Sequence, residues 1–307
     1  RCTVSSMDCA VETLAALLAV PSFTKLTIQK LVAGCLSLGV QPEELWQNSR
    51  RWKNSKFALS EEQRASWNLF RQRWSLQGYA EYLDQLEVKV IGQKDFPLLL
   101  REAPDAPLLL FLQGNSMCLK PPHVAVVGSR TPTRYGQWAT QKIVAGLVAR
   151  DVAIVSGFMV GIDYQSHQVA VKAGGRSVGG LGLGFGQMYP AHLKRAAADF
   201  LEKGNLFVTE YPPQTEPRPW QFAARNSIVA GLSAATVIVE AKAKSGSLIT
   251  AQCALDAGRV VGAVPGPIDS VYSQGTHQLL KQGAVLICSG DDVWHEITDA
   301  ATDPSNK

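Results

Sequence analysis

Two kinds of hydrophobic segment alternate along the chain from residue 123 onward. Short apolar runs rich in β-branched residues are separated by longer stretches in which apolar residues recur with the period of a helix. The short runs predict buried strands, and the longer stretches predict amphipathic helices. The predicted strands span residues 124–127, 152–155, 176–181, 206–209, 236–239, 260–264 and 285–287, and the predicted helices span residues 135–150, 163–173, 191–203, 227–234 and 247–257.

Continuous apolar strands that alternate with helices indicate a parallel sheet whose two faces are both buried. Right-handed crossovers then place helices on both faces. The predicted fold class is therefore α/β, with an extended Rossmann-like, doubly wound and mostly parallel sheet. No apolar run reaches the roughly 18 residues that a membrane-spanning helix needs, which excludes a transmembrane protein.

The first part of the chain lacks strand alternation and predicts helices over residues 11–20, 24–38, 42–46 and 61–77, the last opened by a capping box at Ser60 and Gln63. Residues 79–120 predict a βαβ unit, with strands at 88–91 and 108–112 and a helix at 96–102. We expect a small helical domain over 1–78, the Rossmann-like domain over 79–290 and a C-terminal tail over 291–307. The helical domain fits a module that binds the DNA backbone, or a domain for packing and protein interaction.

Composition and charge limit the classes of function. Hydrophobic residues make up 46% of the 307 residues and charged residues 18%, so the chain can build a full core and is not disordered. The formal net charge is only +4, so any nucleic acid must be met by a local basic patch. Residues 50–57 hold four basic and two aromatic side chains, a composition that suits nucleic acid and also suits a solvated loop.

The six cysteines form no Cys-x-x-Cys pair, so we expect neither a structural zinc site nor a redox motif. Sparse free thiols are typical of proteins in a reducing compartment. We therefore expect a cytoplasmic protein without a bound metal.

Ligands of open α/β sheets bind beyond the carboxyl ends of the strands, and here those ends are rich in glycine, serine and basic residues. Glycines let backbone N–H groups approach an anion, serine hydroxyls donate to phosphate oxygens, and Arg130 adds a planar cation. The candidate positions are Gly128, Ser129, Arg130, Ser156, Gly157, Gly182, Gly184, Lys244, Ser245, Gly246 and Ser247. Several such loops at one sheet edge predict a site for phosphate groups.

The same strand ends argue against a nucleotide cofactor, since neither G-x-G-x-x-G nor a P-loop follows a predicted strand. Asp163, Glu210 and Glu240 could hold Mg²⁺ as in a nuclease, but we favour helix capping by Asp163 and loop hydrogen bonds from the glutamates. We expect His167 to pair structurally with Asp163, one helical turn earlier. No serine lies in a G-x-S-x-G elbow, so we assign no catalytic residue.

The motifs at the strand ends also have a distinctive order along the chain. They are Gly128-Ser129-Arg130, Tyr135-Gly136, Ser156-Gly157, Gly161-Ile162-Asp163, Gly182 with Gly184, Arg225-Asn226, Val239-Glu240-Ala241, Ser245-Gly246-Ser247 and Val264-Pro265-Gly266. In this order the sequence resembles the DNA-processing protein A family, also called DprA or Smf. The resemblance covers about residues 79–290.

The resemblance implies a protein that is not an enzyme, needs no cofactor and binds single-stranded DNA in a basic pocket of an extended Rossmann fold. It also implies a homodimer that helps to load a RecA-type recombinase in natural transformation or recombination. Carried over by motif, the residues that would face the phosphates are Ser129, Arg130, Gly157, Arg225, Asn226, Lys244, Ser245, Gly246 and Ser247. The implied dimer interface lies in the last part of the Rossmann region, near His277 and Leu280.

Three positions depart from the family's pattern of arginines, namely Val160, Ala224 and Ser227. Each lost charge removes a possible phosphate contact and the counterion release that comes with it. We therefore expect DNA binding that is weaker, differently placed or shared with residues 50–56.

Two other classes of function stay open. One is a Rossmann-like enzyme that cleaves nucleotides or nucleosides, although the Pro-Gly-Gly-x-Gly-Thr-x-x-Glu phosphate motif of that group is reduced here to Pro265-Gly266. The other is an interaction protein whose DNA pocket has drifted.

Overall fold

The N-terminal part of the chain is helical, as its pattern predicts. The computed structural model describes residues 11–47 and 59–302, so the basic stretch at 50–57 lies outside the described residues. The first helices are α1 (Val11–Leu18), α2 (Lys25–Leu38), α3 (Pro42–Gln47), α4 (Glu61–Arg73) and α5 (Leu76–Gln85). Thr24 caps the start of α2, Gly39 ends it in the left-handed conformation, and Ser60 and Gln63 form the predicted capping box of α4.

The prediction of a single helix over residues 61–77 is wrong. Trp74 is extended and ends α4, and Ser75 caps α5 by accepting a hydrogen bond from the Gly78 N–H at 2.9 Å. A serine side chain can take over backbone hydrogen bonds in this way, so the helical period alone did not reveal the break. The predicted boundary at residue 78 lies inside α5, and the division into domains stays a prediction.

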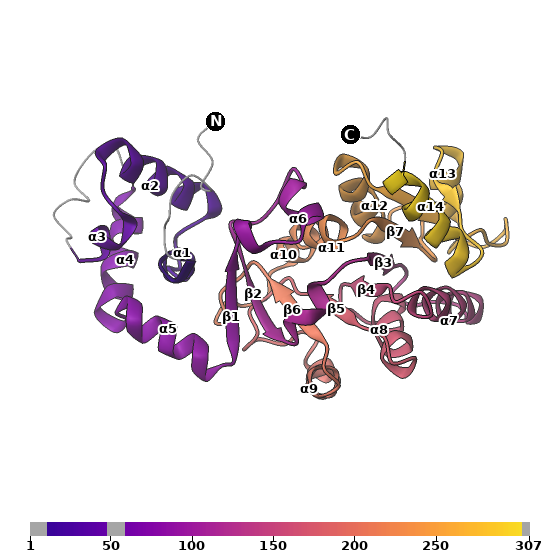
Figure 1. Ribbon diagram of the computed structural model, residues 1–307, viewed down its shortest axis with the longest axis horizontal. Helices are drawn as coiled ribbons and strands as arrows, with labels where there is room; N and C mark the ends of the chain where they lie inside the picture. The colour runs from indigo at the N-terminus through magenta and orange to yellow at the C-terminus, as the bar shows by residue number, and fades with distance from the viewer. Residues whose placement is uncertain (1–10, 48–58, 303–307) are drawn as a thin grey trace.

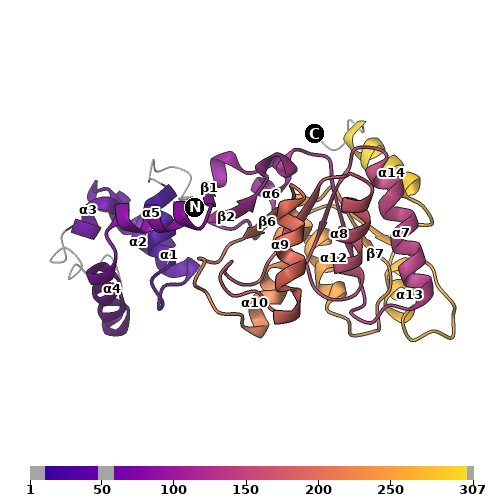
Figure 2. The same cartoon turned by 90° about the horizontal axis from the view of Figure 1, so that it is seen from below.

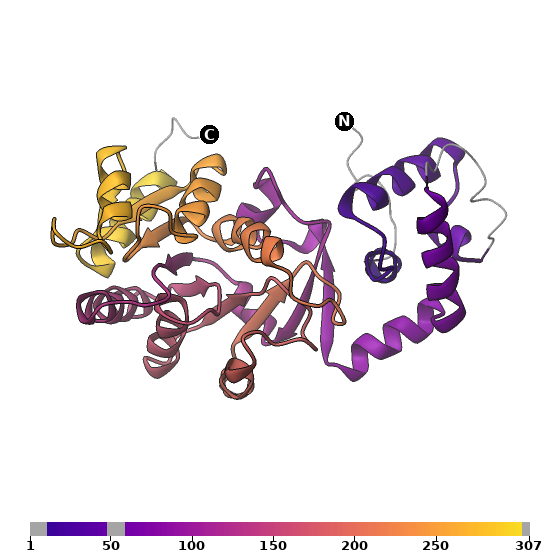
Figure 3. The same ribbon diagram turned by 180° about the vertical axis from the view of Figure 1, so that it is seen from behind.

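Aromatic rings form much of the core of the N-terminal helices. Trp67 is buried, and its ring centroid lies 5.1 Å from that of Phe23 and 5.9 Å from that of Trp46. Val88 and Phe111, which belong to the first two strands of the sheet, are members of the same buried cluster. The helices therefore pack against the β1 end of the sheet, as Figure 1 shows and as Figure 3 shows from behind.

The described residues form a nine-stranded sheet in the order β1-β2-β6-β5-β4-β3-β7-β8-β9. Its strands are β1 (Val88–Gly92), β2 (Leu109–Gly114), β3 (His123–Val127), β4 (Ala153–Ser156), β5 (Ser177–Gly180), β6 (Leu206–Thr209), β7 (Ala235–Ile238), β8 (Val260–Ala263) and β9 (Val285–Leu286). The seven strands β6, β5, β4, β3, β7, β8 and β9 are all parallel to one another. Strand β2 is antiparallel to both of its neighbours, β1 and β6. The predicted fold class, an extended, mostly parallel Rossmann-like sheet, is confirmed.

The prediction of a βαβ unit over residues 79–120 is wrong, because β1 and β2 are antiparallel. Val88 lies opposite Gln113 and Gly92 lies opposite Leu109, so β2 starts at the end of the sheet where β1 stops. The connection between them contains η4 (Gln93–Asp95) and the short helix α6 (Leu98–Glu102). A parallel pair would need a crossover back along the whole strand, which this connection does not make.

Helices cover both faces of the sheet. On one face lie α7 (Arg134–Val148), α8 (Ile162–Lys172), α9 (Lys194–Glu202) and α14 (Gly290–Thr302), the first three of which stand in a row in Figure 2. On the other face lie α6, α11 (Asn226–Leu232), α12 (Ser247–Asp256) and α13 (Gln274–Lys281). The remaining helical segments are α10 (Pro219–Ala224), η5 (Ser116–Leu119) and η6 (Ala191–Leu193).

Residues 291–302, which the sequence analysis assigned to a tail, belong to α14. Val293 and Ile297 of this helix are buried in the same cluster as Ile143 and Leu147 of α7. The last helix is therefore part of the covering layer on that face of the sheet.

The parallel strands bring the predicted site loops together. β3, β4, β5 and β7 point the same way, so their carboxyl ends lie at one edge of the sheet. The loops that leave this edge begin at Gly128, Gly157, Leu181 and Val239.

Candidate functional site

A cleft of about 500 Å³ opens at the carboxyl edge of the sheet, and we call it the edge cleft. The loop after β3, the loop between β7 and α12, and the junction of α10 with α11 supply most of its lining. Nine of the thirteen predicted positions line it, namely Gly128, Ser129, Arg130, Arg225, Asn226, Lys244, Ser245, Gly246 and Ser247. Whether these residues contact DNA stays a prediction.

The loop after β3 presents Arg130 to the cleft. A Cβ on Gly128 would lie 2.9 Å from the Cγ1 of Ile162 and 3.0 Å from the carbonyl oxygen of Glu240, so only glycine fits there. The Ser129 side chain is buried, and its Oγ accepts a hydrogen bond from the Thr131 N–H at 3.1 Å. Arg130 is exposed, so its guanidinium is the charged group of this loop that can reach a ligand.

The loop between β7 and α12 adds two more exposed cations, Lys242 and Lys244. The ammonium group of Lys242 lies 5.0 Å from the ring centroid of Tyr272. Behind the lysines, the hydroxyls of Ser245 and Ser247 are 2.8 Å apart where α12 begins. Lysines, hydroxyl groups and a helix N-terminus all favour an anion at this end of the cleft.

A carboxylate and a guanidinium lie beneath the cleft. Arg225 is only 4% exposed and donates to the carbonyl oxygen of Gly180 at 2.9 Å. Burial raises the pKa of Asp163 to about 6, against the opposing effects of Arg225, of the N–H groups of Gly128 and Gly157, and of Arg130. A Cβ on Gly157 would collide with both side chains, so only glycine leaves room for them here.

Two expectations about Asp163 are wrong. Its carboxylate accepts from the N–H groups of Gly128 and Gly157 in the neighbouring strand loops, whereas the residue at the N-cap of α8 is Gly161. The predicted pair with His167 does not form, because Nδ1 of His167 lies 2.7 Å from Ser177 Oγ and its Nε2 has no hydrogen-bond partner among the residues that the structure describes.

The glutamates make the expected loop hydrogen bonds. Glu240 accepts from both the N–H and the hydroxyl of Thr133, at 2.9 and 2.5 Å, and so fixes the start of α7. Glu210 is hydrogen-bonded to Tyr211, and burial raises its pKa. In residues 11–47 and 59–302, no group of three His, Cys, Asp or Glu side chains is arranged to hold a metal ion.

Four predicted positions lie outside the lining of the edge cleft. Ser156 is fully buried and donates to the carbonyl oxygen of Val126 at 2.7 Å. A Cβ on Gly182 would lie 2.9 Å from the carbonyl oxygen of Gln221, and one on Gly184 would collide with the backbone of residues 212 and 213. The absence of a side chain at Gly157, Gly182 and Gly184 therefore lets neighbouring segments approach closely.

Sequence reasoning missed several residues that line the cleft. Lys242 stands two positions before Lys244 in the same loop, so the charge pattern could have revealed it. Phe222 could not have been found in this way, because the fold of α10 brings it to the cleft. Beside Phe222 lies the exposed ring of Tyr189, 5.8 Å away between centroids, and Trp220 on α10 is 60% exposed.

The structure gives two different surroundings to the three positions that lack the family's arginines. Val160 is half-buried and packs against an aromatic cluster around Phe158. Ala224 is exposed, and the Ser227 hydroxyl donates to its carbonyl oxygen at 2.8 Å. Ala224 and Ser227 thus flank the two lining residues Arg225 and Asn226, whereas Val160 belongs to a core.

Comparison with known proteins shows similarity along most of the chain to the family that the sequence motifs resemble. The model of the DNA recombination-mediator protein A family matches residues 87–298. The DNA processing protein DprA of Bacillus subtilis is 39% identical over 210 residues, which cover 68% of this chain and 70% of that protein. DprA of Streptococcus pneumoniae is 42% identical over 201 residues, which cover 66% and 71%.

Two solved structures extend the comparison. The X-ray structure of DprA from Streptococcus pneumoniae has a TM-score of 0.78 at 31% identity and covers 94% of this chain and 99% of that chain. A structure of DprA from Helicobacter pylori, concerned with its single-stranded DNA binding mode, has a TM-score of 0.62 at 25% identity and covers 69% and 96%. The family match spans more than half of the sequence, and the chain therefore belongs to the DNA recombination-mediator protein A family, that of DprA and Smf.

Proposed function

We propose that the protein binds single-stranded DNA in the edge cleft and does not cleave it. The observation that carries this proposal is the arrangement of exposed cations around the cleft, with Arg130 on one loop and Lys242 and Lys244 on another. Such groups make charge-assisted contacts with phosphates, which position a strand without reading its sequence. Ser129, Asn226 and residues 245–247 also line the cleft.

Exposed aromatic rings beside the cleft favour a single strand over a duplex. Tyr189 is 50% exposed and Trp220 is 60% exposed, and Phe222 lines the cleft itself. Unpaired bases can stack on such rings, whereas the bases of a duplex are already stacked on one another. The single-stranded DNA binding mode of the Helicobacter pylori relative supports the same choice.

The hydrogen bonds made by the carboxylates near the cleft support a binding role over an enzymatic one. Glu240 is engaged with Thr133, and Asp163 is engaged with the N–H groups of two strand loops. Both groups therefore serve to hold loops in place. A nucleotide-cleaving enzyme, the alternative class, would need a carboxylate turned toward the substrate or its metal ion.

We further propose a homodimer in the cytoplasm that passes single-stranded DNA to a RecA-type recombinase in transformation or recombination. Family membership supports a recombinase as the partner, and the free cysteines of the described chain suit a reducing compartment.

The proposed dimer interface includes β9, because β9 is the last strand of the sheet and its Leu286 is 54% exposed. Beside it in α13, Leu280 is half-buried against the core, and His277 Nε2 lies 3.0 Å from the carbonyl oxygen of Gly266.

The first test is the affinity of the Arg130→Ala variant for a fluorescent oligothymidine, measured by anisotropy. Loss of a charge-assisted phosphate contact should weaken binding by about 5- to 150-fold. Arg195→Ala is the matched control, since Arg195 is an exposed arginine of α9 outside the cleft, and it should bind almost as the parent does. An equal loss in both variants, or shortening of the oligonucleotide in the presence of Mg²⁺, would contradict the proposal.

A second test uses the pKa of Asp163. Below about pH 6 its carboxyl becomes neutral, which leaves the charges of Arg225 and Arg130 less compensated. Affinity for the oligothymidine should therefore rise between about pH 7.5 and about pH 5.5, by about 2- to 15-fold for charges roughly 10 Å from a phosphate. Asp163→Asn should bind tightly throughout and lose this dependence. An equally steep pH dependence in the Asn variant would show that another group titrates.

The dimer is tested by light scattering of the full chain and its Leu286→Lys variant. The parent should have twice the mass of one chain, and the variant should be a monomer, because a charge placed at a packed apolar interface must be desolvated. Leu69→Lys is the control, since Leu69 is a 68% exposed leucine of α4 and its replacement should leave the mass unchanged. A parent that is monomeric at high micromolar concentration would exclude this dimer.

A further inference from the structure

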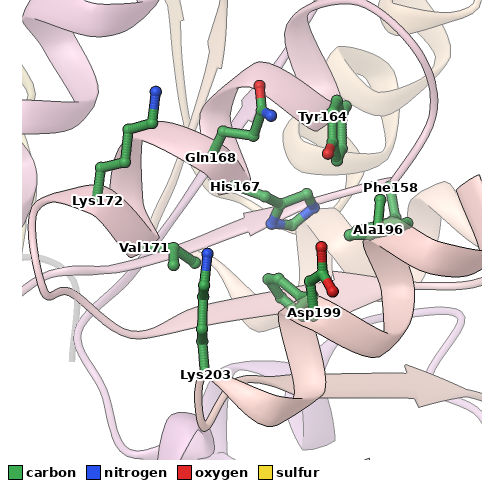
Figure 4. A pocket seen from close by; sticks show the side chains of 10 residues that line it. Phe158, Tyr164, His167, Gln168, Val171, Lys172, Ala196, Asp199 and Lys203 are labelled. Carbon is green, nitrogen blue, oxygen red and sulfur yellow. The ribbon is translucent and has the colours of Figure 1, made fainter.

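A second pocket lies between α8 and α9, and we call it the α8–α9 pocket (Figure 4). It has a volume of about 140 Å³, and Phe158, Phe200 and Val171 give it apolar walls. None of its lining residues lines the edge cleft. The proposed DNA site therefore does not use this pocket.

His167 is the buried polar side chain of the α8–α9 pocket. It is 1% exposed, and Figure 4 shows its imidazole in the middle of the lining side chains. The Ser177 hydroxyl, 2.7 Å from Nδ1, donates its own proton to the carbonyl oxygen of Ile154 at 3.0 Å. The hydroxyl oxygen must therefore accept from His167, which places the imidazole proton on Nδ1.

This tautomer leaves Nε2 of His167 as a bare acceptor. Among residues 11–47 and 59–302, no group forms a hydrogen bond with Nε2. Burial also lowers the pKa of His167 to about 3, so the ring stays neutral and Nε2 keeps its lone pair at physiological pH. A buried acceptor of this kind calls for a donor, and the side chains around it supply none.

The rim of the pocket is charged. Lys172 at the end of α8 and Lys203 just after α9 are exposed, and Figure 4 shows both on the same side of the imidazole. Asp199 is also exposed at the rim. Two ammonium groups against one carboxylate leave a net positive charge, which favours a ligand with a single negative charge.

We propose that the α8–α9 pocket binds a single-ring aromatic acid that carries a hydroxyl group on its ring. A cavity of about 150 Å³ holds benzene, so this pocket has room for one ring and not for two. The ring would pack against Phe158 and Phe200, its hydroxyl would donate to Nε2 of His167, and its carboxylate would be drawn to the two lysines. Because Nε2 is closed to bulk water, entry includes a small movement of the lining side chains.

The experiment is a titration of the full chain by calorimetry with three probes. 4-Hydroxyphenylacetate has all three features, phenylacetate lacks the hydroxyl, and 4-hydroxybenzyl alcohol lacks the carboxylate. The first should bind, and each of the others should bind about tenfold more weakly or worse, because a buried acceptor or a charged rim is left unpaired. No binding of the first probe, or equal binding of phenylacetate, would overturn the proposal.

Variants place the binding in this pocket. Ala196→Leu fills the pocket and should abolish binding, whereas Ala198→Leu, at an exposed position of the same helix, should bind as the parent does. Both should keep the parent's affinity for oligothymidine, which reports an intact fold. Lys172→Gln with Lys203→Gln changes only exposed side chains and should weaken the acid without weakening the alcohol. Unchanged binding of the acid in Ala196→Leu or in the double lysine variant would refute the site.

Discussion

A pair of opposite charges beneath the edge cleft holds the loops of the proposed site together. Asp163 belongs to α8 and Arg225 lies at the junction of α10 and α11, and both lie against Gly157 in the loop after β4. Asp163 also binds the N–H of Gly128 after β3, and Arg225 donates to Gly180 at the end of β5. Each charge offsets part of the cost of burying the other, because opposite charges attract strongly in a buried environment.

This constraint divides the polar residues of the sheet edge into two groups. Asp163, Arg225 and Glu240 are committed to holding loops, each through contacts with the protein itself. Arg130 and the lysines of the β7–α12 loop are exposed and free to meet a ligand. The first group sets the shape of the cleft, and the second sets its charge. Replacement of the first group should therefore affect both folding and binding, and replacement of the second should affect binding alone.

The sequence predicted the parallel part of the sheet within one or two residues, because strands buried on both faces produce short, continuous apolar runs. It did not predict the direction of β2, because the period of a strand carries no information about its neighbour. The site was only partly predictable for a similar reason. Gly128 and Gly182 look alike in the sequence, yet one lines the cleft and the other lets two backbone segments pack closely.

The central claim is that a few exposed cations at the cleft bind phosphates, and a salt titration of the affinity for oligothymidine tests it most directly. Each phosphate contact of a single strand contributes about −0.7 to the slope of log affinity against log salt, so contacts from Arg130, Lys242 and Lys244 should give about −2. Replacing both lysines by alanine should reduce the slope to about −0.7. A slope near zero in the parent, or one that the double lysine variant leaves unchanged, would contradict the claim.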